Sequence, residues 1–286
     1  MQITAAMVKE LRERTGAGMM ECKQALVDED GGMEAAVGNL RKKGQAKADK
    51  RAGRIAAEGV IGLALAANAG SGALVEVNSE TDFVSKQDEF QEFANTVAQR
   101  ALDERPADLG ALLAVSVRQG ESESIEERIR DMVMRIGENI SVRRFRVMES
   151  AGGNVRAYVH GGRIGVLVDL AGADDTVGKD IAMHVAAVGP TAVGEDDLPT
   201  GVVEKEREIL LAQVADSGKP PEIQEKMIAG RMKKYLKEIT LLGQPFVKDP
   251  DQSVEKYLAG ARASVSAFSR FEVGEGIDKR AENIAE

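Results

Sequence analysis

The sequence predicts a mixed α+β protein in which a small helical unit precedes two related α+β subdomains, each built on a small antiparallel sheet. Two observations indicate this class. Apolar residues recur at helical spacing through the first 45 residues, and a pattern of strand, turn, strand, loop and helix then occurs twice along the chain. A third observation, two long amphipathic segments on either side of a proline-rich turn, predicts an antiparallel coiled-coil hairpin inserted over residues 199–242.

The first 45 residues are expected to fold as a domain of three short helices, which resembles the ubiquitin-associated type of bundle. Thr4 has the side chain of an N-cap residue before the first helix. Gly16 and Gly18, and then Gly31 and Gly32, separate the helices, and the third helix is expected over Met33–Lys43. So small a unit buries little apolar surface, and its stability on its own is expected to be marginal.

A basic segment connects this unit to the rest of the chain. Residues 46–57 are assigned to a linker, and the overlapping run Arg41–Arg54 holds seven basic residues against Asp49 alone. Such a run can follow a nucleic-acid backbone, but single-stranded recognition usually adds aromatic side chains that stack on the bases. This run has none, so a solvated and partly helical linker is favoured over an RNA contact.

The internal repeat defines two subdomains in the core. Each copy is a β-hairpin followed by a helix with one apolar face. The expected strands are Gly59–Ala67 and Ala73–Val77 in the first copy, and Val155–Val159 and Ile164–Leu170 in the second. The apolar helix faces consist of Phe90, Phe93, Ala94 and Val97, and of Ile181, His184, Val185 and Val188. We therefore expect an N-subdomain over 58–148 and a C-subdomain over 149–275, packed side by side with helices on one face of each sheet.

The remaining predicted elements complete the core and the insertion. They are a helix with Ile125, Ile129, Val133 and Ile136 on its buried face, a strand over Ile140–Val147, a final strand over Val265–Val273 and a C-terminal helix over 276–286. In the inserted hairpin, the return helix carries Ile228, Met232, Tyr235 and Ile239 on one face. Protruding arms of this kind serve contacts more often than chemistry.

Composition and motifs give little support to an enzyme. The formal net charge of −9 argues against a protein that mainly coats nucleic acid. Cys22 is the only cysteine, which excludes an intramolecular disulfide and a cysteine-based metal site. His160 and His184 have no histidine or cysteine at ligand spacing, and His184 is expected to be a hydrogen-bonded core residue. We expect no catalytic residue, no metal site and no bound cofactor.

The expected location is the reducing cytoplasm, without membrane attachment. A lone cysteine is typical of that compartment. The N-terminus shows no charged leader followed by an apolar run, and no window approaches 18 uncharged apolar residues.

Several motifs are similar to those of the elongation factor Ts family. They are LRERTGAGMMECKQAL over 11–26, SETDFVSK over 79–86, RIGENISVRRF over 135–145, SGKPPEIQEKMIAGRMKKY over 217–235, GQPFV over 243–247 and FEVGEGI over 271–277. They occur in order over essentially the whole chain. The resemblance implies a guanine nucleotide exchange factor that binds elongation factor Tu in its GDP form and promotes release of GDP and Mg²⁺, so that GTP can bind. Such a protein needs no nucleotide site of its own, and it acts on the GDP, GTP and Mg²⁺ that its partner holds.

The resemblance also assigns roles to particular residues. From the sequence alone, Phe83 stands seven residues before Phe90 and is more readily explained as core. The family pattern implies instead that Asp82 and Phe83 project into the GTPase domain of the partner and disturb the elements that hold Mg²⁺, while Thr81 and Val84 hold the loop. The further contacts that it implies are Met19, Met20, Lys23, Ile136, Gly137, His160 and Val247. Ile136 could equally complete the buried helical stripe, and Lys248 replaces a methionine that many relatives have after Val247.

Two other functions stay open at this point. One is an RNA- or ribosome-associated binding protein, whose RNA affinity would fall steeply with salt. The other is a small-molecule enzyme with a polar pocket between the subdomains. The expected partner is elongation factor Tu, with a homodimer or a 2:2 assembly left open, and neither membrane nor direct nucleic-acid binding is expected.

Overall fold

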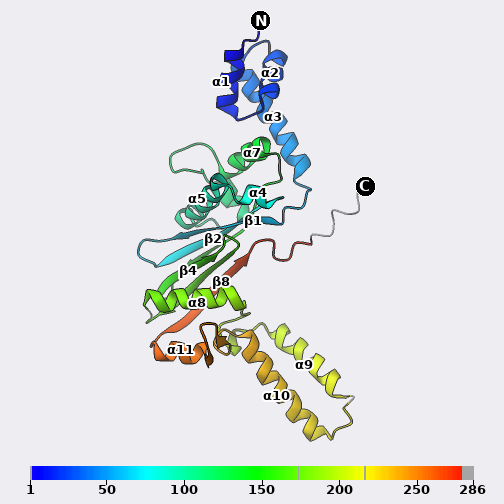
Figure 1. Ribbon diagram of the computed structural model, residues 1–286, viewed down its shortest axis with the longest axis vertical. Helices are drawn as coiled ribbons and strands as arrows, with labels where there is room; N and C mark the ends of the chain where they lie inside the picture. Colours follow the sequence, from blue (N-terminus) through cyan, green and yellow to red (C-terminus); the bar gives the residue numbers. More distant parts are fainter. Residues whose placement is uncertain (1, 173, 216, 279–286) are drawn as a thin grey trace.

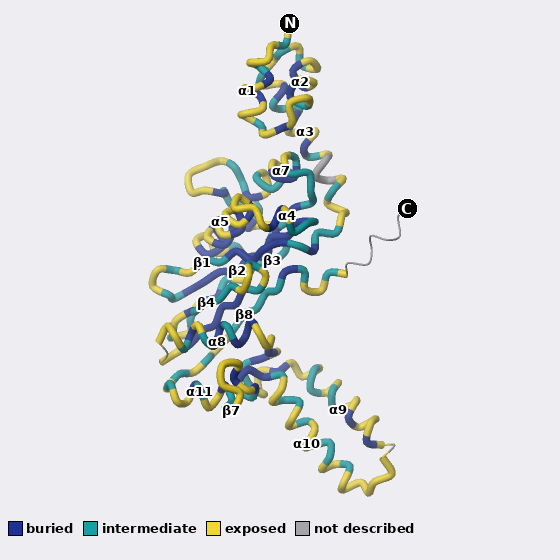
Figure 2. Tube along the Cα trace, viewed as in Figure 1, coloured by how far each residue is buried: buried dark blue, intermediate teal, exposed yellow. Residues whose placement is uncertain are grey.

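The computed structural model describes residues 2–172, 174–215 and 217–278, with the backbone alone for 47–49. The chain is elongated (Figure 1), with three N-terminal helices at one end, two sheets in the middle and a helical hairpin at the other end. The sheets and the helices that cover them hold most of the buried residues (Figure 2). A mixed α+β fold, in which N-terminal helices precede small antiparallel sheets, is therefore confirmed.

Three helices form the N-terminal unit: α1 (Ala5–Thr15), α2 (Met19–Asp28) and α3 (Met33–Arg51). The Thr4 hydroxyl caps α1 by accepting a hydrogen bond of 3.3 Å from the backbone N–H of Met7, as predicted. Gly16 ends α1 in the left-handed conformation, with φ of 67°, which residues other than glycine adopt at a cost. The fully buried residues here include Leu11, Cys22, Ala25, Leu26 and Ala36.

The third helix is longer than predicted. It continues beyond Lys43 to Arg51, so about half of the expected linker 46–57 is helical. The extension lies along α7 (Ile125–Ile136), where a Cβ on Gly44 would lie 1.8 Å from the sulfur of Met134. The Arg51 guanidinium also donates to the carbonyl of Val133 at 3.1 Å. These contacts connect the N-terminal unit to the core and explain why the helix does not end at the edge of its own bundle.

The first sheet has the order β1-β2-β3, with β1 (Glu58–Leu65), β2 (Ser71–Ser79) and β3 (Ser141–Glu149) all antiparallel. Its outer face packs against α5 (Asp88–Glu104), together with α6 (Leu109–Ala114) and α7. Phe90, Phe93, Ala94 and Val97 of α5 are buried against this face, as their spacing predicts.

The second sheet repeats this arrangement, with the order β4-β5-β8 formed by β4 (Asn154–His160), β5 (Ile164–Ala171) and β8 (Ser264–Glu272). Its outer face packs against α8 (Asp175–Val188), on which Ile181, His184 and Val185 are buried. The prediction for Val188 was wrong, because this residue is 44% exposed. It is the last residue of α8, directly before the left-handed Gly189, and lies beyond the end of the core.

The two sheets pack face to face and the helices cover the outer faces (Figure 1). The apolar cluster between them consists of Ile61, Leu74, Met148, Val155, Leu167 and Val273. Gly165 on β5 permits the close approach, since a Cβ there would lie 2.4 Å from Ile61 Cγ2 and 3.0 Å from Leu74 Cδ2.

Replacing Gly165 with alanine is expected to lower the free energy of unfolding by about 1–3 kcal/mol, because the new methyl group overpacks the interface between the sheets. Gly201→Ala is the matched control. It lies in α9 (Thr200–Ala215), where a Cβ would have no atom within 4 Å, and should leave stability unchanged or slightly raised. Urea unfolding of both variants measures the difference, and equal midpoints would contradict this account of the interface.

A buried ion-pair network joins the first sheet to the segment that follows β8. The Glu76 side chain on β2 is fully buried and forms ion pairs with Arg143 and Arg144 of β3, at 3.1 and 2.6 Å. The backbone N–H of Gly274 and the Asn78 amide also donate to it, at 2.8 and 3.0 Å. Burial alone would raise the pKa of Glu76, but these hydrogen bonds and the Arg144 charge outweigh it and leave the pKa below its usual value of 4.5.

The predicted insertion forms a pair of helices, α9 and α10 (Pro221–Ile239), which run side by side away from the sheets (Figure 1). Leu210 and Val214 are the buried residues of α9, and the expected face of α10 is half-buried. The elements around the insertion are the 3-10 turn Glu195–Asp197, β6 (Pro245–Phe246), β7 (Asp249–Ser253) and α11 (Val254–Gly260).

The predicted C-terminal helix over 276–286 lies mostly outside the described residues, and residues 276–278 form a turn and an irregular segment. Within the described ranges, no helix has both the length and the apolar character needed to cross a membrane.

Candidate functional site

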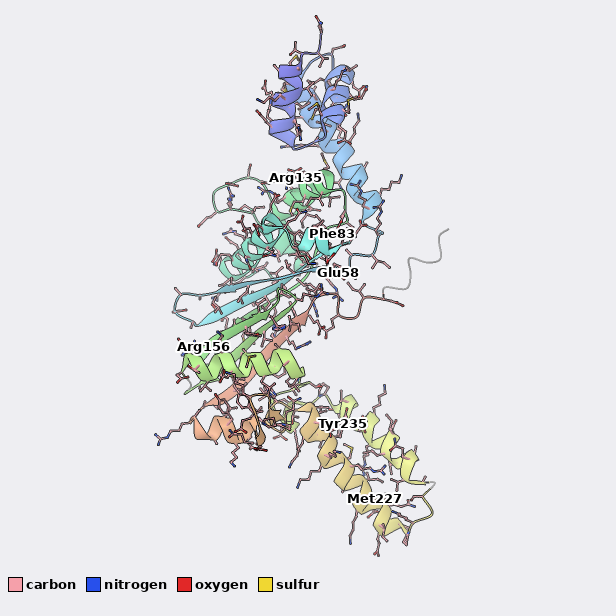
Figure 3. All side chains as sticks on the ribbon, in the orientation of Figure 1. Glu58, Phe83, Arg135, Arg156, Met227 and Tyr235 are labelled. Carbon is pink, nitrogen blue, oxygen red and sulfur yellow. The ribbon has the colours of Figure 1, made fainter. Side chains whose placement is uncertain are left out.

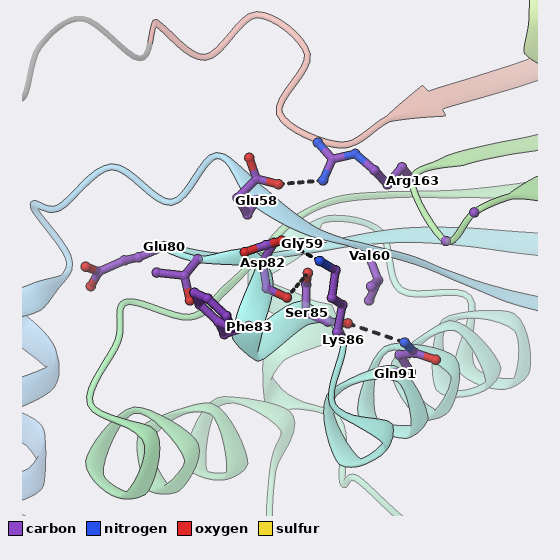
Figure 4. Close-up of a pocket in the computed structure, with 13 residues that line it drawn as sticks. Glu58, Gly59, Val60, Glu80, Asp82, Phe83, Ser85, Lys86, Gln91 and Arg163 are labelled. Atoms are coloured by element: carbon purple, nitrogen blue, oxygen red, sulfur yellow. Dashed lines mark hydrogen bonds and ion pairs between the residues drawn. The ribbon is translucent and has the colours of Figure 1, made fainter.

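The loop that follows β2 presents Phe83 to solvent. β2 ends at Ser79, and the short helix α4 (Asp82–Ser85) begins after two intervening residues. Phe83 is 80% exposed, whereas its neighbour Val84 is buried in the cluster around α5. In Figure 4 the Phe83 ring stands clear of α4. One turn of helix therefore places an aliphatic anchor on the inner side and an aromatic ring on the outer side, so the interpretation of Phe83 as core was wrong.

Glu138 fixes this loop from a distance in the sequence. One of its carboxylate oxygens accepts hydrogen bonds from the backbone N–H groups of Glu80 and Thr81, at 3.1 and 3.0 Å. The other oxygen accepts from the Thr81 hydroxyl at 2.6 Å. In return, Glu80 accepts from the backbone N–H of Asn139 at 2.6 Å. The turn after α7 and the loop after β2 are thus joined by hydrogen bonds in which each segment supplies a carboxylate that accepts from the other.

The turn that carries Glu138 begins at Gly137, which ends α7 with φ of 90° and its N–H on the carbonyl of Val133. A side chain would strain this position, so the glycine lets the chain leave the helix and return toward the loop. Ile136 is half-buried against the core of the first sheet, as its place in the helical stripe predicts. The turn that begins at Ile136 and Gly137 is therefore joined to Glu80 and Thr81 through Glu138.

A groove of about 680 Å³ lies between the Phe83 loop and the turn that joins β4 to β5. The described residues that line it are Glu58, Gly59, Val60, Glu80, Thr81, Asp82, Phe83, Ser85, Lys86, Gln91, Gly161, Gly162 and Arg163. Figures 3 and 4 show Phe83 and Glu58 close together here.

The acidic side chains of this groove are paired with basic ones. Asp82 pairs with Lys86 and Glu58 pairs with Arg163. The hydrogen bond and charge of Lys86 lower the pKa of Asp82, which stays ionised at neutral pH. The lining has neither histidine nor cysteine, and its acids are engaged with basic partners, which gives no support to the small-molecule enzyme.

Two methionines form an exposed apolar patch on the N-terminal unit. Met19 and Met20 open α2 and are 60% and 73% exposed. With Lys23 they line a groove of about 420 Å³, whose other walls are Ile3, Thr4, Ala5, Val8, Lys9 and Arg12. Unbranched methionine side chains adapt readily to a partner surface, so this patch suits a contact. It belongs to a different unit from the Phe83 loop.

The remaining predicted residues lie on the second sheet and beside it. His160 is exposed at the end of β4, rather than in the turn after it, and its Nδ1 lies 3.0 Å from the Tyr158 hydroxyl. The neighbouring residues Gly161–Arg163 line the groove of Phe83. Val247 is exposed after β6, and the Lys248 ammonium is directed to Asp180 at 2.5 Å. The Lys248 side chain is therefore engaged in an ion pair within the chain.

His184 positions the segment that carries Val247. Its ring is fully buried, Nδ1 accepts from the backbone N–H of Val247 at 3.1 Å, and Nε2 lies 2.9 Å from Gln244 Oε1. These partners require the neutral tautomer with the proton on Nε2. Burial lowers the pKa of His184 below 6.5, which the hydrogen bond with Gln244 offsets only in part. The prediction of a hydrogen-bonded core histidine is confirmed.

Because the pKa of His184 is lower in the folded chain than in the unfolded chain, the unfolded state binds the proton more readily. The contribution of His184 to the free energy of unfolding should therefore be fully present above about pH 6.5. The free energy of unfolding should fall as the pH drops below that value. Urea unfolding at pH 7.5 and 5.5 measures the effect, and His184→Gln should reduce the difference between the two pH values. The same pH dependence in both proteins would assign it to other groups.

Comparison with known proteins decides the family. The family model for Elongation factor TS matches residues 80–275, a span that includes the Phe83 loop, Glu138 and the second sheet. Elongation factor Ts of Alkalilimnicola ehrlichii is 55% identical over 286 residues, and that of Thioalkalivibrio sulfidiphilus is 57% identical over 287 residues. Each comparison covers 100% of this chain and 97% of the relative. The chain belongs to the elongation factor Ts family.

Within this member of the elongation factor Ts family, the motifs have separable structural tasks. SETDFVSK contains the exposed Phe83, and RIGEN supplies the carboxylate that holds it. FEVGEGI supplies the Gly274 N–H that donates to buried Glu76. Residue spacing did not identify Glu76, Glu80 or Glu138, because their partners include residues 57 to 198 positions away. The signals in the sequence were the places of Glu80 inside the SETDFVSK motif and of Glu138 inside the RIGEN motif.

Proposed function

We propose that this chain is a guanine nucleotide exchange factor that binds elongation factor Tu in its GDP form and promotes release of GDP and Mg²⁺. The observation that carries the proposal is an aromatic side chain, 80% exposed, on a loop tied down by three hydrogen bonds to one carboxylate. A rigid aromatic group that is exposed before binding loses little conformational entropy when a partner covers it. Membership of the elongation factor Ts family supports the same role.

In the proposed mechanism, Asp82 and Phe83 enter the GTPase domain of the partner. GTPases hold nucleotide through a phosphate-binding loop, a lysine and Mg²⁺. The Phe83 ring displaces the elements that hold the Mg²⁺, and the phosphates lose the ion that neutralises their charge. Thr81 and Val84 keep the loop in place while this happens. The factor itself contributes no cofactor and no catalytic group.

Other surfaces supply binding energy around this wedge. Met19, Met20 and Lys23 of the helical unit, with Ile136 and Gly137, are assigned to the GTPase domain, and His160 and Val247 to the rest of the partner. We further assign residues 1–45 to a ubiquitin-associated-like domain, 46–57 to the linker, 58–148 and 149–275 to the two subdomains, and 199–242 to a coiled-coil hairpin. Exposed Ile209, Leu211 and Ile223 on that hairpin suit a second contact, in a homodimer or a 2:2 assembly. We place this activity in the cytoplasm, where the partner works.

Exchange by this route is a linkage between two binding equilibria. A factor that weakens GDP binding by a given ratio must itself be bound more weakly, by the same ratio, when GDP is present. A shift of the partner from 1:99 to 99:1 in favour of the nucleotide-free state requires about 5.5 kcal/mol of differential affinity. Several separate contact surfaces can supply a difference of this size.

Isothermal titration tests the proposal directly. The affinity of the factor for elongation factor Tu is measured with and without saturating GDP, and the affinity of GDP is measured with and without the factor. The two ratios should agree and should both exceed about tenfold. Equal affinities in the presence and absence of GDP would overturn the proposal.

The basic segment gives little support to the alternative of an RNA-binding protein. Lys43 pairs with Asp28, Arg51 donates to the carbonyl of Val133, and Arg54 lies 3.6 Å from Glu80. These three basic groups are engaged with the chain itself, Lys43 and Arg51 within α3 and Arg54 just after it. RNA affinity that falls steeply between about 50 and 200 mM salt would revive the alternative.

A further inference from the structure

Glu80 and Glu138 form a reciprocal clasp beneath the Phe83 loop. Glu138 accepts three hydrogen bonds from Glu80 and Thr81, and Glu80 accepts one from the residue after Glu138. The clasp also reaches the linker, because the Asn139 amide donates to the carbonyl of Arg54 at 2.7 Å. Three segments far apart in the sequence therefore meet at one pair of carboxylates.

We propose that Glu138 is a positioning residue for exchange. It fixes the position and orientation of the loop that carries Phe83 and does not itself displace the nucleotide. This inference rests on the proposed function. The assignment follows from what else could hold the loop. α4 is only four residues long, and a helix of one turn has no stability of its own.

The usual side-chain capping bond is missing at the start of α4. Thr81 occupies the N-cap of α4, yet its hydroxyl makes no capping bond to the helix. Instead, the hydroxyl donates to Glu138. The Thr81 hydroxyl therefore binds a turn 57 residues away in place of capping its own helix. The other anchors of α4 are the buried side chains of Val84 and Ser85, the Lys86–Asp82 pair at the surface and a hydrogen bond of 3.4 Å from the Gln91 amide to the Ser85 carbonyl. All of these lie after Thr81, and before it the Ser79 hydroxyl donates to the Thr81 carbonyl at 2.9 Å.

The chemistry at Glu138 favours a test with a conservative variant. Glutamine can keep its oxygen where the two backbone N–H groups donate, and its amide can donate to the Thr81 hydroxyl, which then accepts. Glu138→Gln should therefore retain the loop, whereas Glu138→Ala leaves two backbone N–H groups and one hydroxyl without their acceptor.

The experiment measures release of a fluorescent GDP from elongation factor Tu by the full-length chain. Glu138→Ala should lower the rate about tenfold, because Phe83 must then be ordered during binding. Glu138→Gln should stay within about threefold of the unsubstituted chain. The control is Glu149→Ala, which removes an exposed carboxylate paired with Arg105 at the other end of β3, and should have no effect.

A double-variant cycle separates positioning from folding. In a Phe83→Ala background, Glu138→Ala should have almost no further effect, because its role acts through the Phe83 ring. Equal losses in both backgrounds, or a loss with Glu138→Gln as large as with alanine, would overturn the positioning role. If Phe83→Ala itself leaves the rate unchanged, the proposed wedge fails instead, so the two failures are distinguishable. Thermal unfolding of each variant identifies any that is simply unfolded.

Discussion

Phe83→Ala should lower the rate of GDP release from elongation factor Tu by roughly 30-fold or more, the loss that an interface hot spot of ~2 kcal/mol produces. The expected stability of the free protein is unchanged. The ring is 80% exposed and contributes little to the core, so its removal leaves no cavity. Stopped-flow fluorescence measures the rate, and urea unfolding measures the stability.

The matched control is Leu65→Ala. Leu65 is also a large apolar residue exposed on the first sheet, but it ends β1 at the edge opposite Glu58 and the Phe83 groove. It should change neither the rate nor the stability appreciably. A loss of rate with Leu65→Ala equal to that with Phe83→Ala would show that apolar surface in general, rather than the placed ring, is responsible.

Glu76→Ala should have the largest effect on folding. It removes the partner of two arginines that share one fully buried carboxylate, and breaking a buried pair from one side typically costs about 3–5 kcal/mol. It also removes the acceptor for the Gly274 N–H, which ties the end of the second sheet to the first. The expected result is a large fall in the urea midpoint.

Glu149→Ala is again the matched control, because its ion pair with Arg105 is largely exposed and should contribute no more than about 1 kcal/mol. The Glu76 contribution should also depend on pH. Since its folded pKa is lowered, the stabilisation is present above about pH 4.5 and is lost as the pH falls through the folded value. Equal midpoints for the two variants at neutral pH would contradict the assigned role of the buried network.

The spacing of apolar residues predicted the fold because most helices and strands keep one spacing, helical or alternating, along their whole length. The stripe on α7 and the apolar face of α5 are formed by buried or half-buried side chains, and both hairpins pair as their turn residues predict. The sequence predicted a partly helical linker but not where its helix ends, because a tertiary contact decides the length of that element. α3 continues to Arg51 because α7 lies against it, and no residue within α3 indicates that neighbour.

The site could be predicted only in part, for a related reason. The spacing of Phe83 from Phe90 is compatible with a common core face, but a break in the helix between α4 and α5 rotates the two residues apart. The motif implies a projecting ring, which agrees with the 80% exposure of Phe83, whereas composition and spacing favoured a core position. The carboxylate that supports it is contributed by another turn, and only the folded chain brings Glu138 to Thr81.

The most direct test of the central claim is GDP release from elongation factor Tu in excess GTP, with a small, substoichiometric amount of this chain. A factor that binds the GDP form, ejects the nucleotide and leaves when GTP enters should empty the whole population of partner, with each molecule acting many times. Release that stops at one GDP per molecule, or that proceeds no faster than without the protein, would contradict exchange activity.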